Sequence, residues 1–386
     1  MFQITTSMRG GGINMEISAN LAQQIVSDMK NIINQELNFM NTNGYIIAST
    51  DPKRINTEHE GSKIVCATGK ELIIESDQQY KGTRKGINIP VYFENQIIGV
   101  IGITGEKDKV SKFGQIIKKM TEILIKEAWL KELSIQRREN NRRIIEFLIF
   151  TPDSEKKLSN VTQMFDINIT SSKNIIVGKI VKTKSEPSSQ LVEALNSILE
   201  KYLSFNQQQV FTIKNDEIII ILDRILNEDL ESILQNIRNE AFNKLEVTLI
   251  FGIGSPTGKD ISIQSSYQQA SSTVRWFSSF SDQCFHYFCE MDLGLILNRV
   301  SQTDKAAYLN KVFSRLSDEE IKEYIQILSI YGKNNGSITK SSKDLFIHKN
   351  TLQYKLNKLA KLTGYNPRDL DDYVILKLAF LLYELG

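Results

Sequence analysis

Residues 349–362 carry the side chains best suited to contacting a nucleic acid. Leu352, Leu356 and Leu359 recur at the spacing of one helical face, so this stretch is predicted to be a helix seated by its leucines. The opposite face would present Asn350, Gln353, Tyr354, Asn357, Lys358 and Lys361. Amide groups can bond base edges and lysines can meet phosphates. The pattern therefore predicts a helix that suits the DNA major groove.

A shorter helix is expected just before it, over residues 338–345, with a break at Phe346, Ile347 and His348. Residues 336–365 contain six Lys and one Asp, a net charge of +5, whereas the whole chain carries only +2. This local basicity favours contact with phosphates, although a helical hairpin with a solvated lysine face is the alternative. The candidate DNA contacts are Lys340, His348, Lys349, Asn350, Thr351, Gln353, Tyr354, Asn357, Lys358 and Lys361.

The stretch LFIHKNTLQYKLNKLAKLTGYNPRDLDDYVILKLA resembles the C-terminal helix-turn-helix of the PucR/CdaR group of bacterial transcription regulators. The resemblance is carried by the aromatic-Ile-His step, the Asn-Thr-Leu opening, the Tyr-x-Leu core and the closing Leu-Thr-Gly. It implies an all-α domain, here placed at residues 291–386, that binds double-stranded DNA.

A second set of polar residues lies in the N-terminal third. Arg54 and His59 bracket Thr57, the expected N-cap of a short helix, and Lys85 and Gly86 begin a strand where glycine lets the backbone approach closely. Cations and open N–H groups are what a bound carboxylate requires. The candidate ligand-binding residues are Ser49, Arg54, His59, Lys85, Gly86, Asn88, Thr104 and Gly105. Taken singly, Arg54 also fits a surface ion pair, His59 a core histidine and the glycines ordinary turns.

The strings NGYIIASTDPKRINTEHEGS and KGINIPVYFENQIIGVIGITG resemble the sugar diacid recognition domain that opens CdaR-type regulators. That resemblance implies a small hydroxylated acid as the ligand, such as glucarate, galactarate or glycerate. Together with the DNA unit, it implies a ligand-responsive regulator of genes for uptake and catabolism of that acid.

The helices and strands expected around the candidate ligand-binding residues indicate a small α+β sensor domain over residues 15–133. An amphipathic helix is expected over residues 17–37, followed by a hairpin whose turn is Asn43-Gly44. Later strands are expected at 72–74, 87–93 and 97–104, and then a long helix over 108–150, broken near Asn140. Residues 1–14 are expected to form a poorly ordered leader. Residues 134–150 are interpreted as a linker that carries the signal and contacts a second copy.

Residues 151–290 are predicted to follow the βαββαβ order of a ferredoxin-like domain. This domain resembles the degenerate cyclase-like middle domain of the same regulators. Active diguanylate cyclases require a Gly-Gly-Asp/Glu-Glu-Phe turn, whereas the corresponding hairpin here reads KNDEI, from Lys214. We therefore expect no catalytic residues, although Asp216 and Glu217 keep open the alternative of a nucleotidyl-cyclase-type enzyme with an appended sensor.

The totals are consistent with a multidomain α+β protein. A length of 386 residues indicates two or three domains, and no apolar run reaches the roughly 18 residues of a membrane span. Cys66, Cys284 and Cys289 make no disulfide framework, and Cys284, His286 and Cys289 lack the spacing of a metal site. We expect no cofactor or metal, a cytoplasmic location and a homodimer or higher homo-oligomer.

Overall fold

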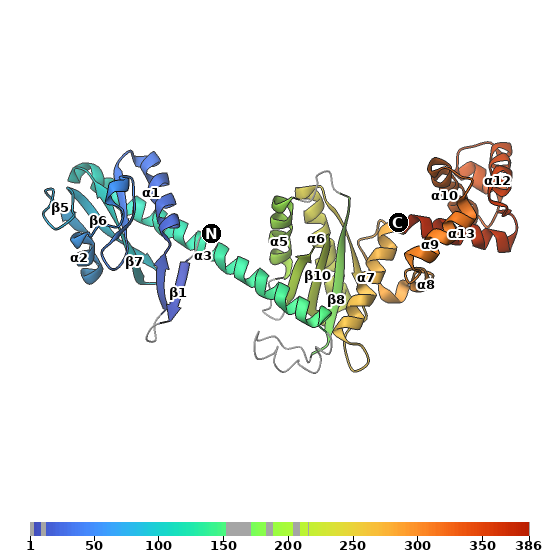
Figure 1. Cartoon of the computed structure of the whole chain (residues 1–386), viewed down its shortest axis with the longest axis horizontal. Helices are drawn as coiled ribbons and strands as arrows, with labels where there is room; N and C mark the ends of the chain where they lie inside the picture. Colours follow the sequence, from blue (N-terminus) through green and yellow to red (C-terminus); the bar gives the residue numbers. More distant parts are fainter. Residues whose placement is uncertain are drawn as a thin grey trace. The chain divides into compact units, whose positions relative to one another are not determined.

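The computed structural model describes residues 4–8, 13–151, 171–182, 188–203, 209–214 and 216–385. The chain divides into two compact units, Met1–Glu139 and Asn140–Gly386 (Figure 1). No helix in these described ranges is long and apolar enough to cross a membrane.

The first unit is built on a five-stranded antiparallel sheet. Its strand order is β4-β3-β7-β6-β5. The strands are β3 (Glu36–Met40), β4 (Ile46–Ser49), β5 (Leu72–Ile74), β6 (Gly86–Phe93) and β7 (Gln96–Thr104). The helices are α1 (Ala19–Ile33), η1 (Pro52–Arg54), α2 (Glu60–Thr68) and α3 (Lys107–Phe150).

Strand alternation divides the side chains of this sheet between two faces. Leu37, Phe39 and Ile101 point to the face where α1 and the start of α3 pack, forming the main core of the unit. Met40 and Val100 point to the other face, where they meet Val65 of α2. The sheet is therefore covered by helices on both sides, with α2 over the second face (Figure 1).

The first helix is shorter than the predicted 17–37. Ser18 caps its start by accepting a hydrogen bond from the N–H of Leu21, and Asn34 ends it in the left-handed conformation, with φ of 51°. Residues 36–40 then join the sheet as β3, because Leu37 and Phe39 alternate with Asn38 and fill the core as a strand.

The N-terminal stretch differs from the predicted leader. Residues Ile4–Met8 (β1) and Ile13–Ile17 (β2) pair as an antiparallel ladder, with Ile4 opposite Ile17. Isoleucine and threonine at residues 4–6 favour strand over coil, which accounts for the difference.

Helix α3 runs over 44 residues without the break predicted near Asn140. Its sequence contains no proline, and its one glycine, Gly114, lies in the second turn, so the backbone has no reason to kink at Asn140.

The second unit begins with a ferredoxin-like domain, as predicted. The elements are β8 (Lys173–Lys182), α5 (Ser189–Leu203), β9 (Val210–Lys214), β10 (Glu217–Asp223), α6 (Asn227–Leu245), β11 (Thr248–Ile253), α7 (Ile263–Phe280) and β12 (Phe285–Tyr287). The sheet order is β12-β11-β8-β10-β9, in which the added edge strand β12 runs parallel to β11. The predicted turn residue Asn215 lies outside the described residues.

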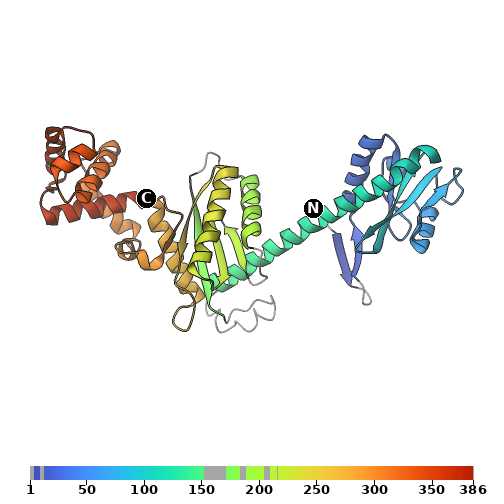
Figure 2. The ribbon, with the colours of Figure 1, turned by 180° about the vertical axis from the view of Figure 1, so that it is seen from behind.

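Helices α5 and α6 cover one face of this sheet (Figure 2). The other face receives α7 and the last turns of α3, whose Ile145 packs against Ile175 and Ile221. The C-terminal end of α3 is thus part of the core of the second unit.

The C-terminal region is all helical. It comprises η3 (Phe288–Glu290), α8 (Gly294–Leu297), α9 (Gln302–Phe313), α10 (Asp318–Lys333), α11 (Ile338–Asp344), α12 (Lys349–Thr363) and α13 (Leu370–Glu384). Leu352, Leu356 and Leu359 are fully buried in its core, where they meet Tyr324 of α10 and Leu376 of α13. The leucine face predicted from spacing is therefore the face that seats α12.

Candidate ligand site and nucleic-acid interface

A row of polar side chains crosses the sheet of the first unit on the face toward α2. Asn38 lies opposite Ser49 on one side and Gly102 on the other, and Gly102 in turn lies opposite Asn88. Ser49, Asn38 and Asn88 are 2%, 4% and 4% exposed. Buried polar groups in one register require partners, so this row is the first sign of a site.

Glycines at two positions leave the space that the side chain of Asn88 fills. A Cβ at Gly102 would lie 2.8 Å from Oδ1 of Asn88, and one at Gly61, in the first turn of α2, would lie 2.9 Å from Nδ2 of Asn88. The same position at Gly61 is 3.3 Å from Cε1 of His59. Asn88 and His59 therefore converge on one point between the sheet and the start of α2.

Arg54 reaches the same row from η1. Its Nη2 donates to the carbonyl of Gly82 at 2.5 Å. With the amide oxygen of Asn38 turned toward it, Nη1 of Arg54 donates to that oxygen at 2.8 Å, and Nδ2 of Asn38 donates to Oγ of Ser49 at 2.7 Å. Both acceptors are neutral, and no carboxylate pairs with Arg54 among the contacts of the described residues.

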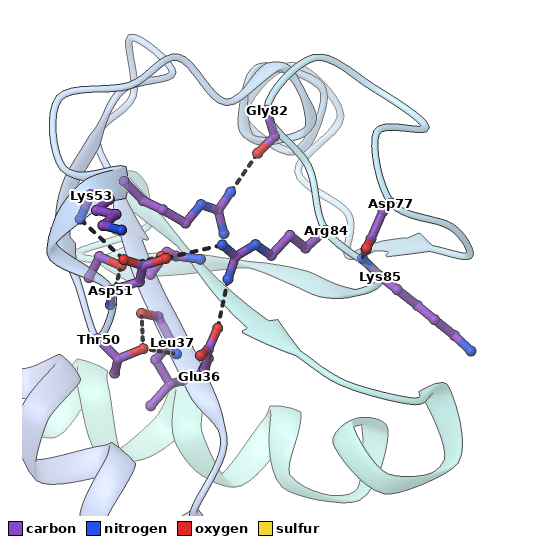
Figure 3. A network of polar contacts seen from close by, with 12 residues as sticks. Glu36, Leu37, Thr50, Asp51, Lys53, Asp77, Gly82, Arg84 and Lys85 are labelled. Carbon is purple, nitrogen blue, oxygen red and sulfur yellow. Dashed lines mark hydrogen bonds and ion pairs between the residues drawn. The ribbon is translucent and has the colours of Figure 1, made fainter.

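Arg54 is partly buried, lies near Arg84, and feels the charges of Asp51, Glu36 and Asp77 without forming an ion pair with them. Burial, and then the nearby charge of Arg84, lower the pKa of Arg54. Arg84 itself is neutralised, since its Nη1 pairs with Glu36 at 2.8 Å and its Nη2 with Asp51 at 3.0 Å (Figure 3). Of these two neighbouring cations, Arg54 is therefore the one that can accept an anion without losing an existing ion pair.

His59 is a neutral hydrogen-bond donor in this arrangement. Its Nδ1 accepts from the N–H of Ser62 at 3.2 Å, so the ring proton lies on Nε2. Burial, and then the charge of Arg54, lower the pKa of His59 to about 4. His59 is also the N-cap of α2, whereas the predicted cap, Thr57, uses its hydroxyl to donate to the carbonyl of Arg54.

The amide nitrogen of Asn88 is the remaining open group. It is buried and has no hydrogen-bond partner in the described part of the chain. An unmade bond at a buried donor costs about 1–3 kcal/mol, so the group favours an acceptor brought by a ligand. A guanidinium, an imidazole N–H and an amide N–H are together suited to an acid that also carries hydroxyl groups.

The structure brings four of the predicted binding residues together and separates the others. Ser49, Arg54, His59 and Asn88 share this cluster. The exposed side chain of Lys85 points away from it, and its backbone N–H donates to Asp77 at 2.7 Å (Figure 3). Gly86 of β6 lies opposite Thr104 of β7, and this pair is two residues further along the two strands than the pair of Asn88 and Gly102. Gly105 donates its N–H to the carbonyl of Lys85 at 3.0 Å.

Asn38, Ser62 and Thr83 are further buried polar residues that sequence reasoning missed. Asn38 sat inside an expected strand, and pairing that strand with the one containing Gly102 would have revealed it. Ser62 and Thr83 have no comparable signal, because their positions depend on how α2 and the loop before β6 pack.

The second candidate site is the helix-turn-helix formed by α11 and α12. Ser341 and Ser342 of α11 are buried. His348 caps α12 by accepting from the N–H of Asn350 at 3.2 Å. All ten predicted DNA contacts are exposed: Lys340, His348, Lys349, Asn350, Thr351, Gln353, Tyr354, Asn357, Lys358 and Lys361.

Two of the lysines on α12 already have carboxylate partners. Nζ of Lys358 pairs with Glu320 of α10 at 2.7 Å, and Lys355 pairs with Glu323 of the same helix. Lys361 has no ion pair of this kind among the described contacts. The predicted basic face is therefore partly neutralised from within the domain.

Cys284, His286 and Cys289 do not converge as metal ligands. His286 stacks on Phe277 with ring centroids 3.7 Å apart. Its ring nitrogens meet Glu290 at 3.2 Å and Ser281 at 2.8 Å. Within the described ranges, no group of three or more His, Cys, Asp or Glu residues could hold a metal ion.

Three family models match consecutive parts of the chain. Residues 17–148 match a model for sugar diacid recognition, and residues 151–276 match a GGDEF-like domain. Residues 324–382 match the PucR C-terminal helix-turn-helix domain. In these three parts the chain is similar to transcription regulators of the PucR/CdaR group.

Relatives align over most of the chain. The Carbohydrate diacid regulator of Escherichia coli (strain K12) is 26% identical over 381 residues, covering 95% of this chain and 98% of that protein. YsfB of Bacillus subtilis (strain 168) is 25% identical over an alignment that covers 93% of this chain and 96% of YsfB. The Purine catabolism regulatory protein of the same organism is 23% identical, covering 77% and 59%. A regulator of polyketide synthase expression from Bifidobacterium adolescentis, solved by crystallography, has a TM-score of 0.29 and 14% identity over 63% of this chain and 91% of that one, too low to inform the fold.

Proposed function

We propose that this regulator binds a small hydroxylated acid, a sugar diacid or glycerate, in its N-terminal unit and controls genes for the uptake and catabolism of that acid. The observation that carries the proposal is Arg54, a guanidinium held by two neutral acceptors. Arg54 contacts Asn38, which shares one row of the sheet with Asn88, and the amide nitrogen of Asn88 has no hydrogen-bond partner among the described residues. A carboxylate would pair with Arg54 and a hydroxyl or carboxylate oxygen with the amide of Asn88.

Calorimetric titration of glycerate, glucarate and galactarate into the full chain tests the ligand class. We expect at least one of the three to bind and to raise the melting temperature, because a ligand that binds only the folded state stabilises it. Acetate is the matched control, since it offers a carboxylate without hydroxyl groups and should bind more weakly. Binding of none of the three acids would refute this ligand class.

The proposed alternative, a nucleotidyl cyclase, has less support. The middle domain matches a GGDEF-like model, but its hairpin sequence KNDEI lacks the two glycines expected in an active cyclase. Incubating the chain with GTP or ATP and Mg²⁺, and measuring cyclic product, tests the point. We expect no cyclic nucleotide to form, and its formation would support the cyclase alternative.

We further propose that the regulator works in the cytoplasm, where bacterial DNA lies, and as a homodimer, because helix-turn-helix proteins generally read two half-sites. Helix α3 offers a surface for pairing, since Ile116, Ile123 and Leu130 follow each other at seven-residue spacing and are 57%, 54% and 55% exposed.

Sedimentation of the full chain tests this surface. Ile123→Glu should shift the dimer toward monomer, whereas Ile135→Glu, at a 48% exposed isoleucine outside the seven-residue pattern, should not. Equal sedimentation of both variants and the parent chain would exclude this face of α3 as the dimer contact.

A further inference from the structure

The turn between α11 and α12 contains an unusual helix cap. The N–H of Phe346 donates to the carbonyl of Lys343 at 3.0 Å, and the N–H of Ile347 donates to that of Ser342 at 3.0 Å. These two bonds are the Schellman pattern, whose residue in the left-handed region is most often glycine. Here that residue is Phe346, with φ of 53°.

The phenyl ring of Phe346 makes no packing contact that would offset this backbone strain. Phe346 is 96% exposed, the highest value among the exposed large hydrophobic residues in the described part of the chain. Its neighbours Leu345 and Ile347 both pack against the C-terminal core, but Phe346 does not. A residue that is strained in its backbone and unburied in its side chain marks a functional position better than a structural one.

The position of the ring indicates what it contacts. Phe346 lies two residues before His348, the N-cap of α12. In helix-turn-helix proteins, the first residues of the recognition helix meet base edges in the major groove. A phenyl ring has no donor or acceptor for a phosphate, but it can make apolar contact with the C5-methyl group of thymine.

We propose that Phe346 contacts a thymine methyl group in the major groove, beside the bases met by the start of α12. This inference rests on the proposed DNA-binding function of the helix-turn-helix. It assigns to the turn, in addition to the polar face of α12, a part in sequence selection. It also explains why glycine is absent from a cap where glycine would fit better.

The test uses the full chain and a pool of DNA duplexes with a randomised centre. Selection with the parent chain identifies its preferred sequence, and the same selection is repeated with Phe346→Gly. Leu370→Ala is the control, because Leu370 is also a 76% exposed apolar residue of this domain. Replacing each preferred thymine by uracil, which lacks only the methyl group, then locates the contact.

We expect Phe346→Gly to bind the selected duplex about tenfold more weakly, to lose the preference at one thymine and yet to melt at a higher temperature. Uracil at that position should weaken binding by the parent chain about fourfold and leave Phe346→Gly unaffected. If the parent chain binds DNA and Phe346→Gly binds with the same affinity and the same sequence preference, the inference about Phe346 is wrong, but the proposed DNA-binding function still stands. A parent chain that binds no duplex at low salt would instead overturn the proposed function.

Discussion

Replacing Arg54 by alanine tests the candidate ligand site most directly. The guanidinium has two neutral partners, Gly82 and Asn38, and no carboxylate among the described contacts, so its removal breaks no ion pair within the protein. The cost falls on the ligand, whose carboxylate would be left without its cation. Hydrogen bonds to charged groups contribute about 1.5–3 kcal/mol, and leaving the charge unpaired adds to this. We expect a loss of about 2–4 kcal/mol, or roughly 30- to 1000-fold in affinity.

Calorimetry with the acid that binds the parent chain measures this loss. Arg54→Lys should give an intermediate affinity, because it keeps the charge but loses the two-bond geometry. Lys85→Ala is the matched control, since this lysine is exposed and points away from the cluster. DNA affinity without ligand should stay unchanged in all three variants. If Arg54→Ala binds the acid as tightly as the parent chain, the ligand site is not where we propose.

A second readout comes from His59. The charge of Arg54 is the second cause, after burial, of its low pKa of about 4. Arg54→Ala should therefore raise the pKa of His59, which an NMR titration of the ring can follow. An unchanged pKa would mean that the two side chains do not lie as close together as the structure places them.

Five other substitutions have defined outcomes. In DNA-binding titrations at several salt concentrations, Lys361→Ala should make the slope of the logarithm of the DNA-binding constant against log salt shallower by about one. Lys358→Ala should change that slope less, because this lysine is already paired with Glu320. Asn350→Ala should instead reduce the discrimination between DNA duplexes of different sequence by about 1–3 kcal/mol. Because the folded pKa of His59 lies at about 4, below its ordinary 6.5, its contribution to stability is complete above pH 6.5 and is lost as the pH falls to about 4. That contribution amounts to about 3 kcal/mol, and His59→Asn, which can still cap α2, should flatten the dependence in acid unfolding curves. Gly102→Ala should abolish acid binding in calorimetry but spare DNA binding in gel shifts, because the added methyl group displaces the side chain of Asn88.

Periodicity predicted those elements whose buried face repeats regularly. The leucines of α12, the alternating strands of both sheets and the ferredoxin-like order all follow from such repeats. Boundaries were less predictable. The end of α1 depends on Asn34 adopting a left-handed conformation, and the cap of α2 on a buried histidine rather than on the threonine that local preference favours.

The candidate ligand site was only partly predictable, because it is defined by strand register. Arg54, His59 and Asn88 could be singled out by residue type. Lys85 has an equally suitable side chain, but it precedes β6 and is exposed. Asn38 carries no signal until β3 is paired with β7, which places it beside Gly102. A one-residue change of register would put these amides on the opposite face.

The ion pairs between α10 and α12 have a consequence for how the regulator finds its operator. Lys358 and Lys355 are held by Glu320 and Glu323, so these two lysines contribute less to binding of phosphates at large. A recognition helix with weaker hold on random sequence dissociates from wrong sites sooner and spends more of its time sampling new ones. The carboxylates of α10 should therefore lower the affinity of the helix for random DNA, so that less of the protein is held at wrong sites.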